Sequence, residues 1–112
     1  MEEVDFLNPK IRHLLKAFRD ELETVYGERL AHLVLYGSFA RQEETEGSDV
    51  DVLVVLAGDV SQADEIWQMG KAKTMLLLIY EELISVVPMS LKDFLYRDSP
   101  LLQNVRSEGI LV

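Results

Sequence analysis

One stretch of the chain decides the fold: residues 31–57, which read AHLVLYGSFARQEETEGSDVDVLVVLA. Its two apolar runs, residues 31–36 and 52–57, are short and bounded by turn residues, which predicts two buried β-strands over residues 31–36 and 50–57. Gly37 follows the first run and lets the backbone turn sharply and approach a ligand without a Cβ in the way. The polar segment at residues 42–47 predicts a loop. The stretch therefore predicts a strand, a tight turn, a loop and a second strand.

Two aspartates, Asp49 and Asp51, stand at the head of the second apolar run. Because side chains alternate along a β-strand, both carboxylates project from one face, with Cα atoms roughly 6.5 Å apart. Such a pair can bind one hard cation or bridge two. Mg²⁺ suits it, because this ion prefers oxygen ligands and is commonly completed by water and substrate phosphates. We therefore expect Asp49 and Asp51 to hold magnesium.

The turn at Gly37 and Ser38 predicts a phosphate site beside that metal. Ser38 offers a hydroxyl and an N–H, and a short helix over residues 39–43 would point its first amides at an anion. Phosphate and metal would then meet between the two strands. The alternative is an ordinary strand-to-helix turn followed by aspartates that merely begin a strand, which predicts no ligand.

This constellation resembles the minimal nucleotidyltransferases of the DNA polymerase β-like superfamily, whose pattern runs Gly-Ser-x-Ala-Arg-Gly, a spacer, and Ser-Asp-x-Asp. The matching positions are Gly37, Ser38, Ala40, Arg41, Ser48, Asp49 and Asp51. Gln42 departs from the pattern, since the family usually has glycine there. The resemblance implies that the two aspartates are the catalytic metal ligands. It places four further residues at the nucleotide: Gly37, Ser38, Arg41 and Ser48. For Arg41, pairing with nearby glutamates is the alternative to a phosphate contact.

A third carboxylate stands on the next core strand in this superfamily, and its place here falls at or near Ser85. Serine supplies neither the charge nor the basicity of a carboxylate. Either the reaction proceeds with two aspartates, or another acid moves in, or activity is lost. Glu81, Glu82 and Asp59 are the nearby acids, and we expect them to be solvated helix-end and turn residues.

The composition of the 112 residues predicts a single domain spanning residues 1–112. Twenty acidic and eleven basic side chains give a net charge of −9, which disfavours direct binding to a nucleic-acid backbone. The same charge suits a basic protein partner or simply a soluble surface. The chain has no cysteine, no signal-like leader and no apolar run of membrane-spanning length, so we expect a cytoplasmic protein without membrane contact.

The remaining patterns predict the elements around the central stretch. Asn8 and Pro9 resemble the cap and first position of a helix that ends at Gly27. Later elements follow as a helix over residues 62–83, an edge strand over 84–89, short helices beginning at Ser90 and Ser99, and a final strand over 110–112. This order predicts an α+β two-layer fold in which helices cover one face of a small mixed sheet and the site lies on the other. The resemblance implies a nucleotidyltransferase domain like the polymerase β palm.

The resemblance also implies a reaction and a partner. Minimal nucleotidyltransferases often occur as antitoxins beside small helical HEPN ribonucleases, and members of the family transfer AMP from ATP to a tyrosine of the toxin. We therefore expect a magnesium-dependent protein adenylyltransferase that uses ATP and forms a hetero-oligomer with a HEPN toxin. One alternative is an antitoxin of impaired catalysis that neutralises its partner by binding alone. Another is a small-molecule transferase of the aminoglycoside type.

Overall fold

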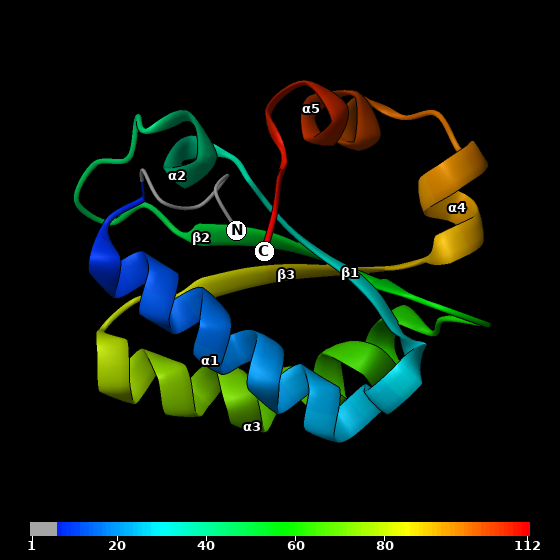
Figure 1. The fold of residues 1–112 in the computed structure, drawn as a ribbon, viewed down its shortest axis with the longest axis horizontal. Helices are drawn as coiled ribbons and strands as arrows, with labels where there is room; N and C mark the ends of the chain where they lie inside the picture. The colour runs from blue at the N-terminus through cyan, green and yellow to red at the C-terminus, as the bar shows by residue number, and fades with distance from the viewer. Residues whose placement is uncertain (1–6) are drawn as a thin grey trace.

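The computed structural model describes residues 7–112, in which helices pack on a four-stranded sheet (Figure 1). The strands are β1 (Leu30–Tyr36), β2 (Val50–Leu56), β3 (Ile84–Ser90) and β4 (Ile110–Leu111), in the order β3-β2-β1-β4. The helices are α1 (Pro9–Tyr26), the 3₁₀ turn η2 (Gly27–Arg29), α2 (Ser38–Arg41), α3 (Gln62–Tyr80), α4 (Leu91–Tyr96) and α5 (Pro100–Glu108). Strand β1 is antiparallel to β2 and β4, whereas β2 and β3 are parallel, so the predicted mixed sheet is confirmed. Residues 1–6 of the predicted domain lie outside the described part.

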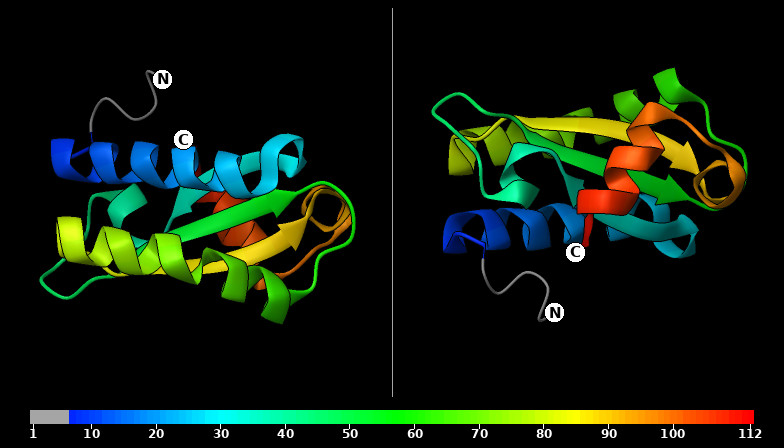
Figure 2. Two further views of the ribbon diagram at one scale, coloured as in Figure 1. Left: turned by 90° about the horizontal axis from the view of Figure 1, so that it is seen from below. Right: turned by 90° about the horizontal axis from the view of Figure 1, so that it is seen from above.

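Helices α1 and α3 lie side by side and antiparallel on one face of the sheet (Figure 2). Helix α1 starts where predicted: the Asn8 side chain accepts the Lys10 N–H at 2.8 Å, and Pro9 holds the first helical position. Its apolar stripe meets the stripe of α3 and the inner face of the strands in one core. This face is the predicted helical layer.

The opposite face of the sheet is not bare. Helix α5 buries Leu102 and Val105 against Leu53 and Val55, which lie on the other side of β2 from the main core. The α+β prediction is confirmed, but the helices are not confined to one face. The physical reason lies in β2, whose residues 52–56 are all fully buried and therefore need cover on both faces.

Element boundaries differ from the prediction mainly at the end of α3. The helix stops at Tyr80 rather than at residue 83, because Glu81 adopts a left-handed conformation with φ of 58° and donates its N–H to the Leu77 carbonyl. The caps predicted for the two short helices are confirmed. Ser90 Oγ accepts the Asp93 N–H at 3.1 Å, and Ser99 Oγ accepts the Leu102 N–H at 3.2 Å. Strand β3 is an edge strand, as its proline indicated.

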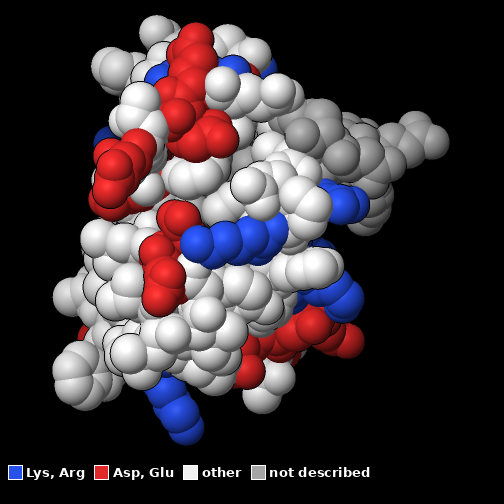
Figure 3. Space-filling view, turned by 90° about the vertical axis from the view of Figure 1, so that its left-hand side faces the viewer, with Lys and Arg blue, Asp and Glu red and all other residues white. Residues whose placement is uncertain are grey.

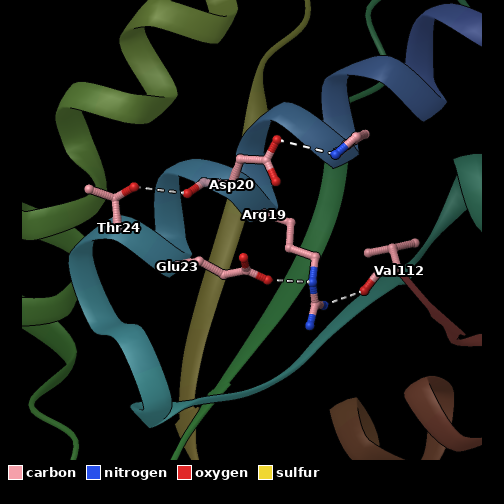
Figure 4. Close-up of polar contacts among 6 residues, drawn as sticks. Arg19, Asp20, Glu23, Thr24 and Val112 are labelled. Atoms are coloured by element: carbon pink, nitrogen blue, oxygen red, sulfur yellow. Dashed lines mark hydrogen bonds and ion pairs between the residues drawn. The ribbon is translucent and has the colours of Figure 1, made fainter.

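The C-terminal segment is tied back onto α1. Arg19 donates one guanidinium N–H to the Val112 carbonyl at 2.6 Å and another to Glu23 at 3.0 Å (Figure 4). Val112 also donates its N–H to the Leu33 carbonyl, next to the pairing of β4 with β1. These contacts fix the segment that follows α5, and with it the end of α5 that reaches the site. Over residues 7–112, none of the helices is both long and apolar enough to cross a membrane.

Candidate active site

The turn after β1 lies directly against Asp51, the aspartate of β2. Gly37 has φ of 80°, a conformation that favours glycine, and a Cβ added there would collide with the Asp51 carboxylate. Tyr36, the preceding residue, pairs with Asp51 across the two strands. Glycine is therefore required at this position for its backbone conformation and for the close approach of the carboxylate.

The two aspartates differ in their surroundings. Asp51 belongs to β2 and is half-buried, whereas Asp49 precedes the strand and is exposed. Burial raises the pKa of Asp51 above its usual value, and the negative charges of Asp49 and Glu108 raise it further, while Arg41 lowers it. The electrostatic cost of holding these carboxylates together would be relieved by a bound cation.

The donor set fits a magnesium ion that is shared with a substrate. Within residues 7–112, no three His, Asp or Glu side chains come close enough to form a metal cage of their own. Asp49 and Asp51 would thus be the protein's share of the ligands, which is the usual pattern for Mg²⁺ bound with phosphate groups. When bound, the ion would neutralise charge on the phosphates. The aspartates would orient it.

The strand register shows which residue of β3 lies beside Asp51. Ser85 of β3 pairs with Asp51 of β2, so the two side chains lie on the same face of neighbouring parallel strands. Ser85 therefore lies beside Asp51, and its assignment as the third-acid position stays a prediction. Glu81 is the C-cap of α3, and Glu82 forms an ion pair with Lys10 at 3.5 Å. Both line the cavity beside Asp49.

Ser38 and Ser48, which we expected near the phosphates, belong to a helix start and a loop turn in this structure. Ser38 is the first residue of α2 and is half-buried. Ser48 Oγ accepts the Thr45 N–H at 2.9 Å, and the Ser48 N–H donates to the Thr45 carbonyl at 3.0 Å. This turn closes the loop that delivers Asp49. Contact of Ser38 and Ser48 with a nucleotide stays a prediction.

Gln42, the departure from the glycine of the family pattern, ends α2. It has φ of 58°, in the left-handed region, and donates its N–H back into the helix. The glycine of the pattern is therefore explained by backbone conformation, and glutamine adopts that conformation at some cost.

Glu108, the last residue of α5, is the site residue that the sequence did not reveal. Its Oε2 accepts the Gly37 N–H at 2.5 Å and an Arg41 N–H at 2.8 Å. Arg41 also donates to Glu43 at 2.9 Å, so the glutamate pairing weighed for this arginine is present. The Glu108 side chain is only 16% exposed. Nothing local in the sequence marks it, because it joins the site only through the packing of α5 and the pairing of β4 with β1.

Comparison with known families decides the class of this site. A family model described as a nucleotidyltransferase domain matches residues 11–108. The chain belongs to this family. The matched span contains the Gly37 turn, both aspartates and Glu108, so the whole candidate site lies within the nucleotidyltransferase domain.

Relatives of this nucleotidyltransferase domain include a protein of Methanocaldococcus jannaschii named "Putative protein adenylyltransferase MJ0141". The two are 32% identical over 78 residues, which cover 70% of this chain and 78% of the relative. Solved structures of similar fold include a toxin–antitoxin with AMP-PNP, at a TM-score of 0.62 and 18% identity, covering 93% of this chain and 72% of that one. Another is a tri-AMPylated Shewanella oneidensis HEPN toxin in complex with MNT antitoxin, at a TM-score of 0.50 and 18% identity, covering 91% and 67%. At these identities the structures show the shared fold.

An open cavity of about 570 Å³ in the nucleotidyltransferase domain is lined in part by Asp49. It lies between the start of α1, the loop before β2 and the end of α3. Its acidic lining residues are Glu44, Glu46, Asp49, Glu81 and Glu82. Figure 3 shows this end of the molecule, over which acidic side chains gather. Such a surface favours a cation or a basic partner surface.

Proposed function

We propose that this nucleotidyltransferase domain transfers AMP from ATP to a hydroxyl of a partner protein in a magnesium-dependent reaction. The partner is a HEPN ribonuclease toxin, the acceptor is a tyrosine, and the domain acts as its antitoxin. The packing of the Gly37 turn onto Asp51 carries the proposal, because it brings the turn that we expect to bind phosphate next to the predicted carboxylate pair. The name of the Methanocaldococcus relative and the AMPylated toxin bound to an antitoxin of similar fold support the choice of acceptor.

The chain's own residues divide the work of such a transfer. Asp49 and Asp51 would hold a cation that neutralises charge on the triphosphate, and Ser38 and Arg41 would contact its terminal phosphates. The acceptor oxygen forms a bond to the α-phosphorus as the bond from that phosphorus to the bridging oxygen breaks. Pyrophosphate leaves, and the hydroxyl proton is released to solvent.

The open cavity beside Asp49 supports a protein as the acceptor. A transferase for small molecules encloses its acceptor in a pocket. Here the cavity is open on the outer side, and a partner surface would complete it. The acidic rim favours a basic partner surface, because opposite charges speed encounter and select the orientation.

A second candidate function is favoured by Ser85. This residue stands beside Asp51, where the superfamily pattern has a carboxylate, and it supplies no charge to a metal. An antitoxin with this site would neutralise its partner by binding alone.

The test is incubation with α-labelled ATP, Mg²⁺ and a HEPN protein encoded beside this chain, followed by intact mass and peptide mapping of both proteins. We expect AMP on a tyrosine of the partner with the wild-type chain and none with the Asp49→Asn, Asp51→Asn double variant. Asp20→Asn is the matched control, since Asp20 is an exposed aspartate on α1, and it should transfer normally. A stable complex without transfer would favour the binding-only antitoxin. Equal transfer by the double variant would show that the carboxylate pair is not the active site.

A further inference from the structure

We propose that two copies of this chain pair through the exposed side of α3, about a two-fold axis near Gly70. Helix α3 is apolar on two opposite sides. Its inner side faces the sheet and buries Glu65, Met69, Ala72 and Leu76. Its outer stripe consists of Ala63, Trp67, Gly70, Thr74 and Leu78. At about 100° per residue, the centres of the two sets lie on opposite sides of the helix.

The outer stripe exposes large apolar side chains in one place. Trp67 is 84% exposed and Leu78 is 77% exposed. Ile66, Met75 and Ile79 flank the stripe and are also exposed. Together these side chains line a hollow formed by α3 alone, which passes over Gly70 and Thr74. Contiguous apolar surface of this kind on a small domain marks an interaction site.

Gly70 gives independent support for close approach by another helix. Glycine inside a helix costs about 0.5–1 kcal/mol relative to alanine. A Cβ added at Gly70 would meet nothing within 4 Å in the described chain, and the residue does not have a positive φ. Its own fold therefore does not require glycine there. A second backbone crossing at Gly70 would require it, because small residues let helix axes come close together.

The outer stripe is complementary to itself when the second helix runs antiparallel. With the two-fold axis between residues 70 and 71, Trp67 faces Thr74 of the second copy and Ala63 faces its Leu78. Each large side chain thus meets a small one, as a two-fold interface requires, since each contact occurs twice. Lys71 faces Gly70 of the second copy, where its aliphatic stem can pack while the ammonium stays in water.

The exposed area suits a dimer of modest stability. The exposed part of Trp67 amounts to about 130–210 Å² per copy. The exposed fractions of Leu78 and the three flanking side chains add roughly two further complete apolar side chains. A standard protein interface buries about 800 Å² per partner. The smaller residues of the outer stripe and the stem of Lys71 would supply the remainder.

The proposed dimer leaves the candidate active site free. Helix α3 packs on the face of the sheet opposite to α5 (Figure 1), and alternation along β2 places Asp51 on the α5 side with Leu53. The C-terminal end of α3 borders the cavity beside Asp49 through Leu77, which is not part of the outer stripe. Both sites of the pair therefore stay open to a nucleotide and a partner. The inference does not depend on the proposed function and can be tested without it.

The first test is the mass in solution by sedimentation at increasing protein concentration. We expect the wild-type chain to approach twice the monomer mass and Trp67→Asp to remain a monomer. Tyr96→Asp is the matched control, because Tyr96 is an aromatic residue on α4 with 81% exposure, and this variant should dimerise. Gly70→Leu should raise the melting temperature at concentrations where the chain is monomeric, yet weaken association at least tenfold. A wild-type chain that is monomeric at all concentrations would overturn the proposal.

The second test locates the axis by cross-linking. The chain contains no cysteine, so a single Gly70→Cys substitution places one thiol near the two-fold axis. Oxidation should convert most of this variant to a covalent dimer. Lys16→Cys, exposed on α1, is the control and should remain monomeric under the same oxidation. If the wild-type chain dimerises but Gly70→Cys does not cross-link more than Lys16→Cys, the proposed interface is wrong.

Discussion

Replacing Glu108 tests whether α5 organises the phosphate turn. Its carboxylate accepts the partly buried Gly37 N–H and an Arg41 N–H on the same oxygen. A hydrogen bond to a charged group contributes about 1.5–3 kcal/mol, so Glu108→Ala should lower the free energy of unfolding by roughly that amount. Glu108→Gln keeps an acceptor for the Gly37 N–H and should lose about half as much. Arg41 is exposed to solvent, and its ion pair with Glu108 should add little to stability.

Nucleotide binding separates a positioning role of Glu108 from a purely stabilising one. Urea unfolding gives the stability of each variant, and calorimetry with Mg²⁺ and AMP-PNP gives its affinity at a temperature where it is folded. We expect about tenfold weaker binding for Glu108→Ala, equivalent to ~1.4 kcal/mol, and near wild-type binding for Glu108→Gln. Glu43→Ala removes the other carboxylate partner of Arg41 and should change neither quantity greatly. Wild-type stability and affinity in Glu108→Ala would refute the reasoning.

Substitutions at three further positions probe two single contacts and one backbone conformation. Ser85→Asp should lower the free energy of unfolding by about 1–3 kcal/mol without Mg²⁺, because the new carboxylate repels Asp51. The melting temperature should therefore fall, and Mg²⁺ should restore it. No response to Mg²⁺ would argue against a metal site there. Gln42→Gly should stabilise the chain by about 0.5–1 kcal/mol in urea unfolding by relieving the left-handed conformation, whereas Gln42→Ala should not. Tyr26→Phe should cost about 1–3 kcal/mol at neutral pH, because it removes a hydroxyl donor from the buried Glu65. Burial, followed by the hydrogen bond to Glu65, raises the pKa of Tyr26 to about 12. Because the unfolded tyrosine loses its proton at lower pH than the folded one, the free energy of unfolding of the wild-type chain should fall between about pH 10 and 12. This decrease should be missing in Tyr26→Phe.

The central strand–turn–strand unit was predictable because its signals are local. Alternation along β2 determines the face on which Asp51 lies. The requirement for glycine at position 37 follows from a single backbone angle. Both signals involve only a few neighbouring residues. Even the position of Ser85 followed from the start of the third strand, which a parallel register then placed beside Asp51. Patterns confined to one strand or one turn can be recognised in a single sequence.

The parts that sequence reasoning missed depend on contacts between distant segments. Glu108 lies 71 residues after Gly37 and reaches it only because α5 packs on β2 and β4 returns beside β1. The end of α3 depends on the conformation of Glu81, a glutamate in a position where glycine or asparagine is usual. Neither Glu108 nor Glu81 lies in a sequence pattern that predicts its role. Tertiary packing decides both.

The arrangement of carboxylates around Gly37 explains how the site could hold a triphosphate without a third acid on β3. Asp51 is already held at an electrostatic cost, because burial and its acidic neighbours Asp49 and Glu108 raise its pKa. A charged residue at position 85 would add a further negative charge to this cluster in the absence of a cation. Serine avoids that cost at Asp51, and Asp49 and Asp51 would still supply two carboxylates to a magnesium ion shared with the phosphates. Serine at position 85 supplies no base for the acceptor hydroxyl. We therefore expect serine, compared with a carboxylate at this position, to lower the rate of transfer more than the affinity for the nucleotide.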